Sequence, residues 1–123
     1  MKNAVNWFEI PVNDFQKAKT FYETILDMQM QVMEAMGMKS AFFPFDMQDG
    51  AIGGFIIKGN GYHPSDKGAL IYLNGGDNLE IALSKVENAG GKVTLPKTAI
   101  GPNGFMAHFI DCEGNRVGLH SKT

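Results

Sequence analysis

The chain opens with alternating apolar and polar residues and then changes to a helical period, in "VNWFEIPVNDFQKAKTFYETIL". In the alternating part Phe8 and Ile10 share one side of an expected strand, and Trp7 and Glu9 share the other. Apolar residues then recur every three or four positions, which predicts an amphipathic helix over residues 14–26. A strand followed by a helix is therefore the first predicted unit.

The same order of elements returns later in the chain. At a shift of about 64 positions, "AFFPFDMQDGAIGGF" lies over "FMAHFIDCEGNRVGL", so that Phe45 matches Phe109 and Gly54 matches Gly118. The shift also lays "DFQKAKTFYETI" over "NLEIALSKVENA", which has a similar helical pattern. We therefore interpret the chain as two copies of one module.

Each copy is expected to fold as a strand, a helix and three strands, and the second copy runs from Ala69 to the end. The segment 59–67 has the glycine and proline content of a linker. We predict one domain over residues 1–123 with modules at about 1–58 and 68–123. In the first module the expected strands are 6–12, 30–34, 39–45 and 52–58.

Composition narrows the functional classes. The 123 residues are 44% hydrophobic, which suits a single folded core. The net charge of -2 comes with scattered lysines, so nucleic acid is not an expected partner. No apolar run has the length of a membrane span, and a single cysteine allows no internal disulfide. We expect a cytoplasmic protein with no membrane partner.

Three stretches resemble one known family over nearly the whole chain. They are "WFEIPVNDFQKAKTFYETIL", "PSDKGALIYL" and "GGKVTLPKT...GPNGFMAHFIDCEGNRVGLHS", and the last contains an Asp-x-x-Gly-Asn turn at residues 111–115. With the duplicated module, they are similar to the vicinal oxygen chelate superfamily of glyoxalase I, bleomycin resistance proteins, fosfomycin resistance enzymes and extradiol dioxygenases. The resemblance implies an α+β fold in which two βαβββ modules form a curved sheet with a concave ligand trough.

The resemblance also implies where a metal would bind. Metal-dependent members carry ligands at one trough-facing position in the first and last strand of each module, and these positions correspond to Trp7, Leu70, Gly54 and Gly118. None of these side chains binds a divalent cation. We therefore predict no metal at the family's usual site and no cofactor.

Three other residues are candidates for acid-base catalysis. If Phe8 and Ile10 face the helix, Glu9 faces the trough, and the same parity places His108 and His120 there. A carboxylate with imidazoles can abstract a proton beside a carbonyl. Two alternatives stay open: they are hydrogen-bonded residues of the sheet, or they form a different metal site.

The trough also contains candidate ligand-binding residues. Trp7 with Phe42, Phe55 or Tyr72 could stack on a planar molecule, and Gly54 and Gly118 would leave room for it. The alternative is that Trp7 fills the space of a lost metal site. The methionines of "MQMQVMEAMGM" are interpreted as adaptable filler rather than copper ligands, and Cys112 as a turn residue.

These observations predict a glyoxalase/bleomycin-resistance-like protein, a homodimer, that handles a small organic molecule. Its reaction would be metal-independent acid-base chemistry of the lyase or isomerase type. The alternative is a non-catalytic protein that sequesters a drug or metabolite.

Overall fold

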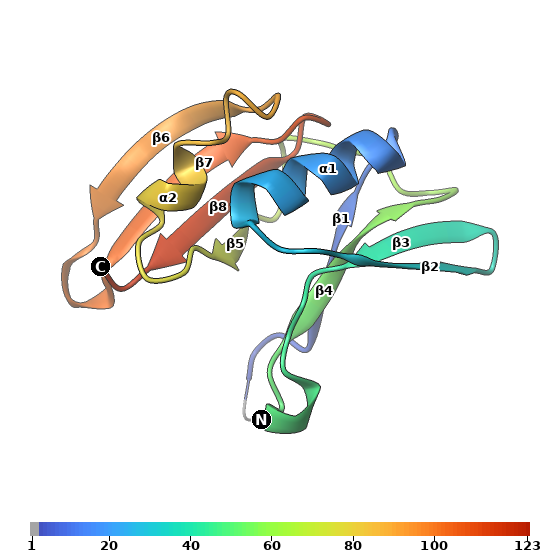
Figure 1. Cartoon of the computed structure of the whole chain (residues 1–123), viewed down its shortest axis with the longest axis horizontal. Helices are drawn as coiled ribbons and strands as arrows, with labels where there is room; N and C mark the ends of the chain where they lie inside the picture. Colours follow the sequence, from blue (N-terminus) through green and yellow to red (C-terminus); the bar gives the residue numbers. More distant parts are fainter. Residues whose placement is uncertain (1–2) are drawn as a thin grey trace.

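A computed structural model describes residues 3–123, which form two four-stranded sheets with α1 between them (Figure 1). The first sheet has the strand order β1-β4-β3-β2 and the second has the order β5-β8-β7-β6. The elements are β1 Trp7–Pro11, α1 Phe15–Leu26, β2 Gln31–Ala35, β3 Met38–Phe42, β4 Gly53–Lys58, β5 Ile71–Asn74, α2 Glu80–Leu83, β6 Lys92–Ala99, β7 Phe105–Ile110 and β8 Arg116–Ser121.

The two sheets repeat one topology. In each, the first strand pairs in parallel with the last, as β1 with β4 and β5 with β8, and the remaining pairs are antiparallel. The parallel pair requires a long connection, which contains a helix and two strands in both halves. The predicted α+β fold of two βαβββ modules is confirmed, whereas the proposed module boundaries stay a prediction.

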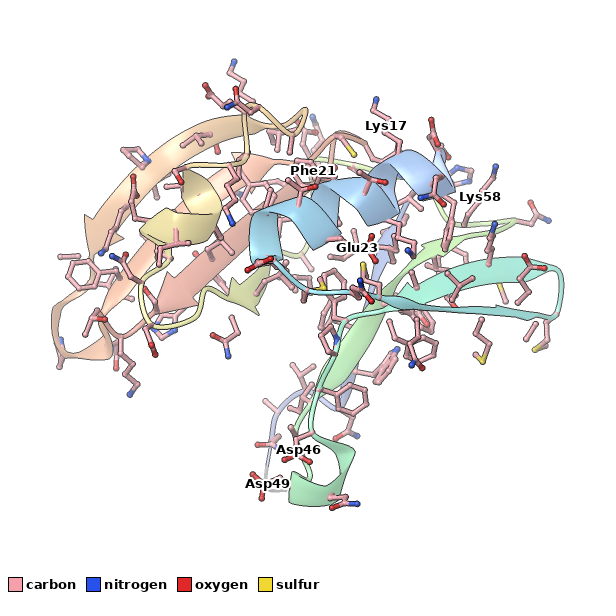
Figure 2. All side chains as sticks on the ribbon, in the orientation of Figure 1. Lys17, Phe21, Glu23, Asp46, Asp49 and Lys58 are labelled. Atoms are coloured by element: carbon pink, nitrogen blue, oxygen red, sulfur yellow. The ribbon has the colours of Figure 1, made fainter. Side chains whose placement is uncertain are left out.

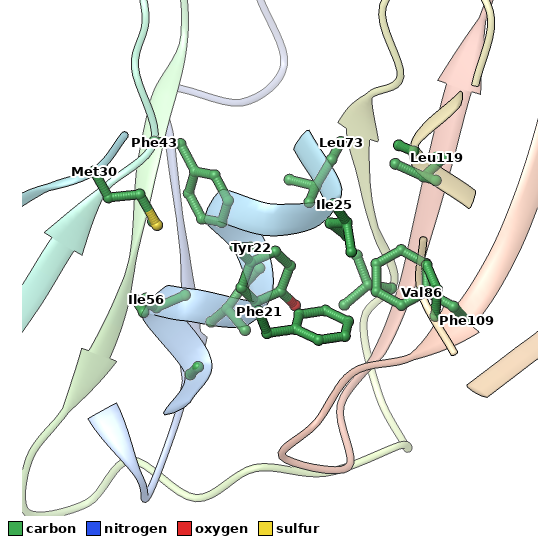
Figure 3. Close-up of a cluster of buried hydrophobic side chains, with 14 of the residues drawn as sticks. Phe21, Tyr22, Ile25, Met30, Phe43, Ile56, Leu73, Val86, Phe109 and Leu119 are labelled. Atoms are coloured by element: carbon green, nitrogen blue, oxygen red, sulfur yellow. The ribbon is translucent and has the colours of Figure 1, made fainter. Parts of the chain in front are cut away.

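Helix α1 forms the centre of the hydrophobic core. It begins at the predicted point, where the Asp14 carboxylate accepts a hydrogen bond from the Lys17 backbone N–H at 3.2 Å. Its neighbouring residues then face different sheets: the Phe21 ring lies 6.0 Å from Phe109, and the Tyr22 ring lies 5.3 Å from Phe43. Figure 3 shows these aromatic residues between the side chains of both sheets, so α1 joins the two halves.

The second helix is shorter than its periodicity predicted. Helix α2 covers only Glu80–Leu83, and several of the following backbone bonds join residues three apart, as from Val86 N–H to Leu83 C=O. The apolar positions nevertheless keep their role, because Leu79, Leu83 and Val86 are buried. The spacing of apolar residues therefore predicted correctly which side chains of this segment are buried. It did not predict that only part of the segment forms an α-helix.

The Asp111–Asn115 turn ties the two halves together. The buried Asp111 carboxylate accepts a hydrogen bond from the Tyr22 hydroxyl at 2.6 Å. The Asn115 side chain donates to the Pro11 C=O at 2.8 Å and accepts from the Ser65 N–H at 3.0 Å. Burial and then Asp111 raise the pKa of Tyr22 well above its ordinary value, which keeps this hydroxyl a donor. The most family-specific sequence signal is thus a structural cross-link.

The segment between β3 and β4 extends away from α1 (Figure 2). The Asp46 carboxylate accepts hydrogen bonds from the N–H groups of Gln48 and Asp49, which closes the turn around the short 3₁₀ helix η1, Met47–Asp49. Among the described residues, no helix has both the length and the apolar character needed to cross a membrane.

Candidate functional site

The face of each sheet that is turned away from α1 is called its open face here. On the first sheet, Trp7 lies on this face beside three phenylalanine rings. The ring of Trp7 meets those of Phe42, Phe45 and Phe55 edge-on, with centroids 5.7, 5.6 and 5.5 Å away. All four side chains are half-buried. The indole is therefore held within an aromatic cluster, and both predicted roles for Trp7, ligand wall and space filler, stay open.

Glu9 lies on the same face and is exposed. Hydrogen bonding to Glu9 is the main cause of a raised pKa for Tyr62, which belongs to the segment between β4 and β5. The loop therefore returns to the open face of the first sheet. Glu9 therefore lies near this loop tyrosine, and no hydrogen bond within residues 3–123 joins Glu9 to His108 or His120.

The prediction that Gly54 faces the trough is wrong by one residue. Gly54 is in register with Phe8, and a Cβ added to Gly54 would lie 2.4 Å from the Phe8 ring, on the side that packs against the core. Glu9 pairs with Phe55 in the first sheet as Tyr72 pairs with Gly118 in the second. Phe55 is therefore the true counterpart of Gly118, because the two halves are offset by one residue less than the sequence match indicated.

The open face of the second sheet carries a cluster of polar side chains around Tyr72. The Tyr72 hydroxyl lies 2.7 Å from His108 Nε2 and 3.6 Å from the Met106 sulfur. These side chains come from β5 and β7, which are separated by β8 in the sheet. Gly118 of β8 lies between them, and an added Cβ there would be 2.5 Å from the Tyr72 ring. Gly118 thus faces the open side as predicted, and the missing side chain lets Tyr72 reach His108.

Arg116 sets the tautomer of His108. Its Nη2 lies 3.2 Å from His108 Nδ1, and a guanidinium can only donate, so Nδ1 must accept. Burial and then Arg116 lower the pKa of His108 below its ordinary value of 6.5, which favours the neutral ring at pH 7. The neutral imidazole therefore carries its hydrogen on Nε2 and donates it to the Tyr72 oxygen. Arg116 has the same parity on β8 as Gly118 and His120, but its contact with His108 was not predicted from the sequence.

His120 lies at the other end of the same face. Its Nε2 is 2.7 Å from the Asn103 carbonyl oxygen, which can only accept, so this nitrogen donates. A surface groove of about 780 Å³ begins beside it and is lined by residues that include Tyr72, Met106 and Lys122. We call it the Tyr72 groove. Tyr72 and His120 therefore share a groove, whereas His108 contacts the Tyr72 hydroxyl without lining the groove.

No hydrogen bond within residues 3–123 joins any two of the three predicted acid-base residues. Glu9 is beside Tyr62, His108 is beside Tyr72 and Arg116, and His120 is beside Asn103. Within residues 3–123 no three His, Cys, Asp or Glu side chains lie close enough to share a metal ion. The alternative metal site built from these residues is therefore not supported by their geometry. The family positions Trp7, Leu70 and Gly118, with Phe55 in place of Gly54, offer no suitable donor either.

Cys112 shows the environment of a structural cysteine. Burial and the carboxylates of Asp111 and Glu113 raise the pKa of its thiol to about 12. A thiol with this pKa is almost fully protonated at neutral pH and is a poor nucleophile. This agrees with its interpretation as a turn residue.

Comparison with known proteins identifies the family. The sequence profile of the Glyoxalase/Bleomycin resistance protein/Dioxygenase superfamily matches residues 4–119. The chain belongs to this superfamily. No curated protein sequence matches it significantly.

Solved structures of the superfamily share the fold at low sequence identity. A glyoxalase/bleomycin resistance protein from Albidiferax ferrireducens T118 matches with a TM-score of 0.74 and 16% identity, over 98% of this chain and 100% of that one. A fosfomycin resistance protein from Listeria monocytogenes matches with a TM-score of 0.65 and 15% identity, over 100% and 94%. Glyoxalase I from Zea mays, as its V278E mutant, matches with a TM-score of 0.69 and 18% identity. That match covers 94% of this chain, which spans only 45% of the maize chain.

Proposed function

We propose that this superfamily member binds a small organic molecule on the open face of its second sheet and exchanges a proton with it through Tyr72, without a metal ion. The observation that carries the proposal is the 2.7 Å contact between the Tyr72 hydroxyl and His108 Nε2. Tyr72 is 45% exposed and lines the Tyr72 groove, so a ligand can reach its hydroxyl. The reaction belongs to the lyase or isomerase type, in which a proton moves next to a carbonyl group.

The positions of the donated hydrogens give Tyr72, His108 and Arg116 separate roles in this proposal. Since His108 donates through Nε2, the Tyr72 oxygen accepts, and its own O–H is available to the Met106 sulfur or to a ligand. When this O–H transfers its proton to a ligand atom, the phenolate that forms is stabilised by the Nε2–H of His108. The proton returns to Tyr72 from another ligand atom or from water. Tyr72 is then the catalytic residue, and His108 and Arg116 are positioning residues.

The other predicted site residues take binding roles in this proposal. His120 uses Nε2 on the Asn103 carbonyl, so it lines the Tyr72 groove and offers only Nδ1 to a ligand. Trp7 and Phe55 present aromatic surface on the first sheet, next to Glu9. We assign them to contact with the apolar part of a ligand.

One observation favours the second candidate function, a non-catalytic protein that sequesters its ligand. Glu9, His108 and His120 have separate surroundings. Within residues 3–123, His108 is therefore the one predicted acid-base residue that hydrogen-bonds to Tyr72. A bound molecule that needs two proton transfers would then be held and not converted. Binding and conversion must therefore be measured separately.

The test begins with a thermal-shift screen of small organic molecules, because a ligand that binds only the native state raises the melting temperature. Each hit is incubated with the protein, and NMR of the small molecule detects any product. Tyr72→Phe should keep binding within about twofold and lower turnover at least 100-fold, since general acid-base catalysis contributes on that order. The matched control is Tyr62→Phe, which removes a tyrosine hydroxyl outside the second sheet.

Three outcomes separate the candidates. Loss of turnover in Tyr72→Phe but not in Tyr62→Phe supports proton exchange through Tyr72. Full turnover in Tyr72→Phe contradicts it. Stoichiometric binding without any product in the wild-type protein selects sequestration.

A further inference from the structure

We infer that the molecule bound on this face is an organic carboxylate, whose carboxylate group pairs with Arg116 and whose planar body lies along the ring of Tyr72. The inference rests on the proposed function, because it names the ligand class of the same open face. It is carried by the charges of the second sheet, by the surroundings of Arg116 and by the spacing between Arg116 and Tyr72.

The second sheet contains cations and no anions. Its four strands hold no aspartate or glutamate, although the whole chain carries 13 acidic residues. Lys92 and Arg116 are both in register with Ile110 and belong to the open face, whereas Lys97 binds Asn78 beside α2 on the covered face. The lining of the Tyr72 groove contains Lys122 and no acid. A face with one sign of charge attracts ligands of the opposite sign. This face therefore favours an anion although the protein as a whole is weakly acidic.

The two acidic residues closest to Arg116 in the sequence already accept hydrogen bonds from other groups. Asp111 accepts hydrogen bonds from Tyr22 and from the turn that it closes. Glu113 accepts hydrogen bonds from the backbone N–H groups of Asn13 and Asp14, on the other half of the molecule. Neither carboxylate forms an ion pair with Arg116, and within residues 3–123 all the ion pairs involve lysines.

Arg116 is suited to a carboxylate. It is the only arginine of the chain, it is exposed, and its contact on this face is the one from Nη2 to His108 Nδ1. A guanidinium has five N–H donors in a planar fork, and the fork matches the two oxygens of a carboxylate. The contact with His108 orients the Arg116 guanidinium, so its N–H donors are already partly ordered before a ligand binds.

The distance between Arg116 and the Tyr72 ring favours an organic anion over an inorganic one. Arg116 and Gly118 are two residues apart on β8, which corresponds to roughly 7 Å along the strand. The Tyr72 ring lies over Gly118, and Met106 lies next to the Tyr72 hydroxyl. A carboxylate on Arg116 therefore places a six-membered ring next to an aromatic and a thioether surface, a contact that inorganic phosphate cannot make.

Benzoate, benzamide and inorganic phosphate are the probes. Benzamide keeps the ring without the charge, and phosphate keeps the charge without the ring. Affinities are measured from backbone amide shifts by NMR on the wild-type protein, on Arg116→Gln and on Lys67→Gln. Lys67→Gln is the matched control, because it removes the same charge from an exposed position in the segment that connects β4 and β5.

We expect benzoate to bind the wild-type protein and Lys67→Gln at least tenfold more tightly than benzamide or phosphate. In Arg116→Gln that preference should fall below twofold, while the affinity for benzamide stays within twofold. Benzoate should also raise the pKa of His108 in the wild-type protein, since a bound carboxylate offsets the charge of Arg116 that helps to lower it.

Equal binding of benzoate and benzamide on this face would overturn the carboxylate inference and leave the proposed function standing. Equal binding of phosphate and benzoate would overturn the organic part of the inference. Perturbations confined to other surfaces would overturn the inference together with the proposed site.

Discussion

At the scale of residues, one missing side chain creates the candidate site. Tyr72 and His108 lie on strands that are not neighbours, and their contact crosses the strand between them at Gly118. Any larger residue at Gly118 would occupy the space of the Tyr72 ring. The site therefore depends on Gly118, a residue with no side chain of its own to contribute.

Gly118→Ala should separate Tyr72 from His108, because the new Cβ would lie 2.5 Å from the Tyr72 ring. Gly54→Ala is the matched control, because its Cβ would lie 2.4 Å from the Phe8 ring on the opposite face of the other sheet. Both should lose about 1 to 3 kcal/mol of stability through overpacking. Only Gly118→Ala should lose ligand binding, by at least tenfold in calorimetry. Equal loss of binding in both variants would contradict the account.

His108 should make stability depend on pH. Its pKa is below 6.5 in the folded protein, so the unfolded chain binds more protons between the two pKa values. The free energy of unfolding should therefore fall as the pH drops below about 6.5. Urea unfolding at pH 7.5 and pH 5.0 measures this fall, which should be smaller in His108→Asn. The same fall in the variant and in the wild type would rule out this contribution.

At the scale of elements, the turn between β7 and β8 holds the two halves in place. Asn115 bonds to the chain at the end of β1 and to the segment before β5, and Asp111 bonds to α1. These partners are far apart in the sequence, so the turn closes long loops. It also sets the start of β8, which carries Arg116 and Gly118.

Asn115→Ala should lower the free energy of unfolding by about 2 to 4 kcal/mol, because it removes a buried side chain and leaves its partners without hydrogen bonds. Chemical denaturation measures this change. Asn88→Ala, at an exposed position, is the control and should change stability by less than about 0.5 kcal/mol. A cost below about 1 kcal/mol for Asn115→Ala would show that the turn does not hold the halves together.

The sequence predicted individual strands and helices better than it predicted how the strands pair. Period-2 and helical patterns depend only on local burial, so they located β1 and α1 and the face of Trp7 and Glu9. The face of Gly54 was misassigned because the repeat is offset by one residue, and only strand pairing reveals that offset. The contacts among Tyr72, His108 and Arg116 depend on side-chain directions from three strands, which no local pattern contains.

At the scale of the whole molecule, the two sheets formed by residues 3–123 have edge strands without a pairing partner. The outer strands are β1 and β2 in the first sheet and β5 and β6 in the second. Exposed edges favour pairing with another copy of the chain. We therefore expect a two-fold homodimer, and light scattering should report about twice 13.5 kDa. A monomer at high micromolar concentration would contradict this expectation.

We propose above all that ligands bind on the open face of the second sheet, next to Tyr72. Backbone amide shift mapping during titration with a hit from the ligand screen tests it most directly. We expect the largest changes in β5, β7 and β8, around Tyr72, His108 and Gly118, and we expect them to be lost in Gly118→Ala. Changes confined to the Trp7 cluster on the first sheet, with the amides of the second sheet unmoved, would contradict it.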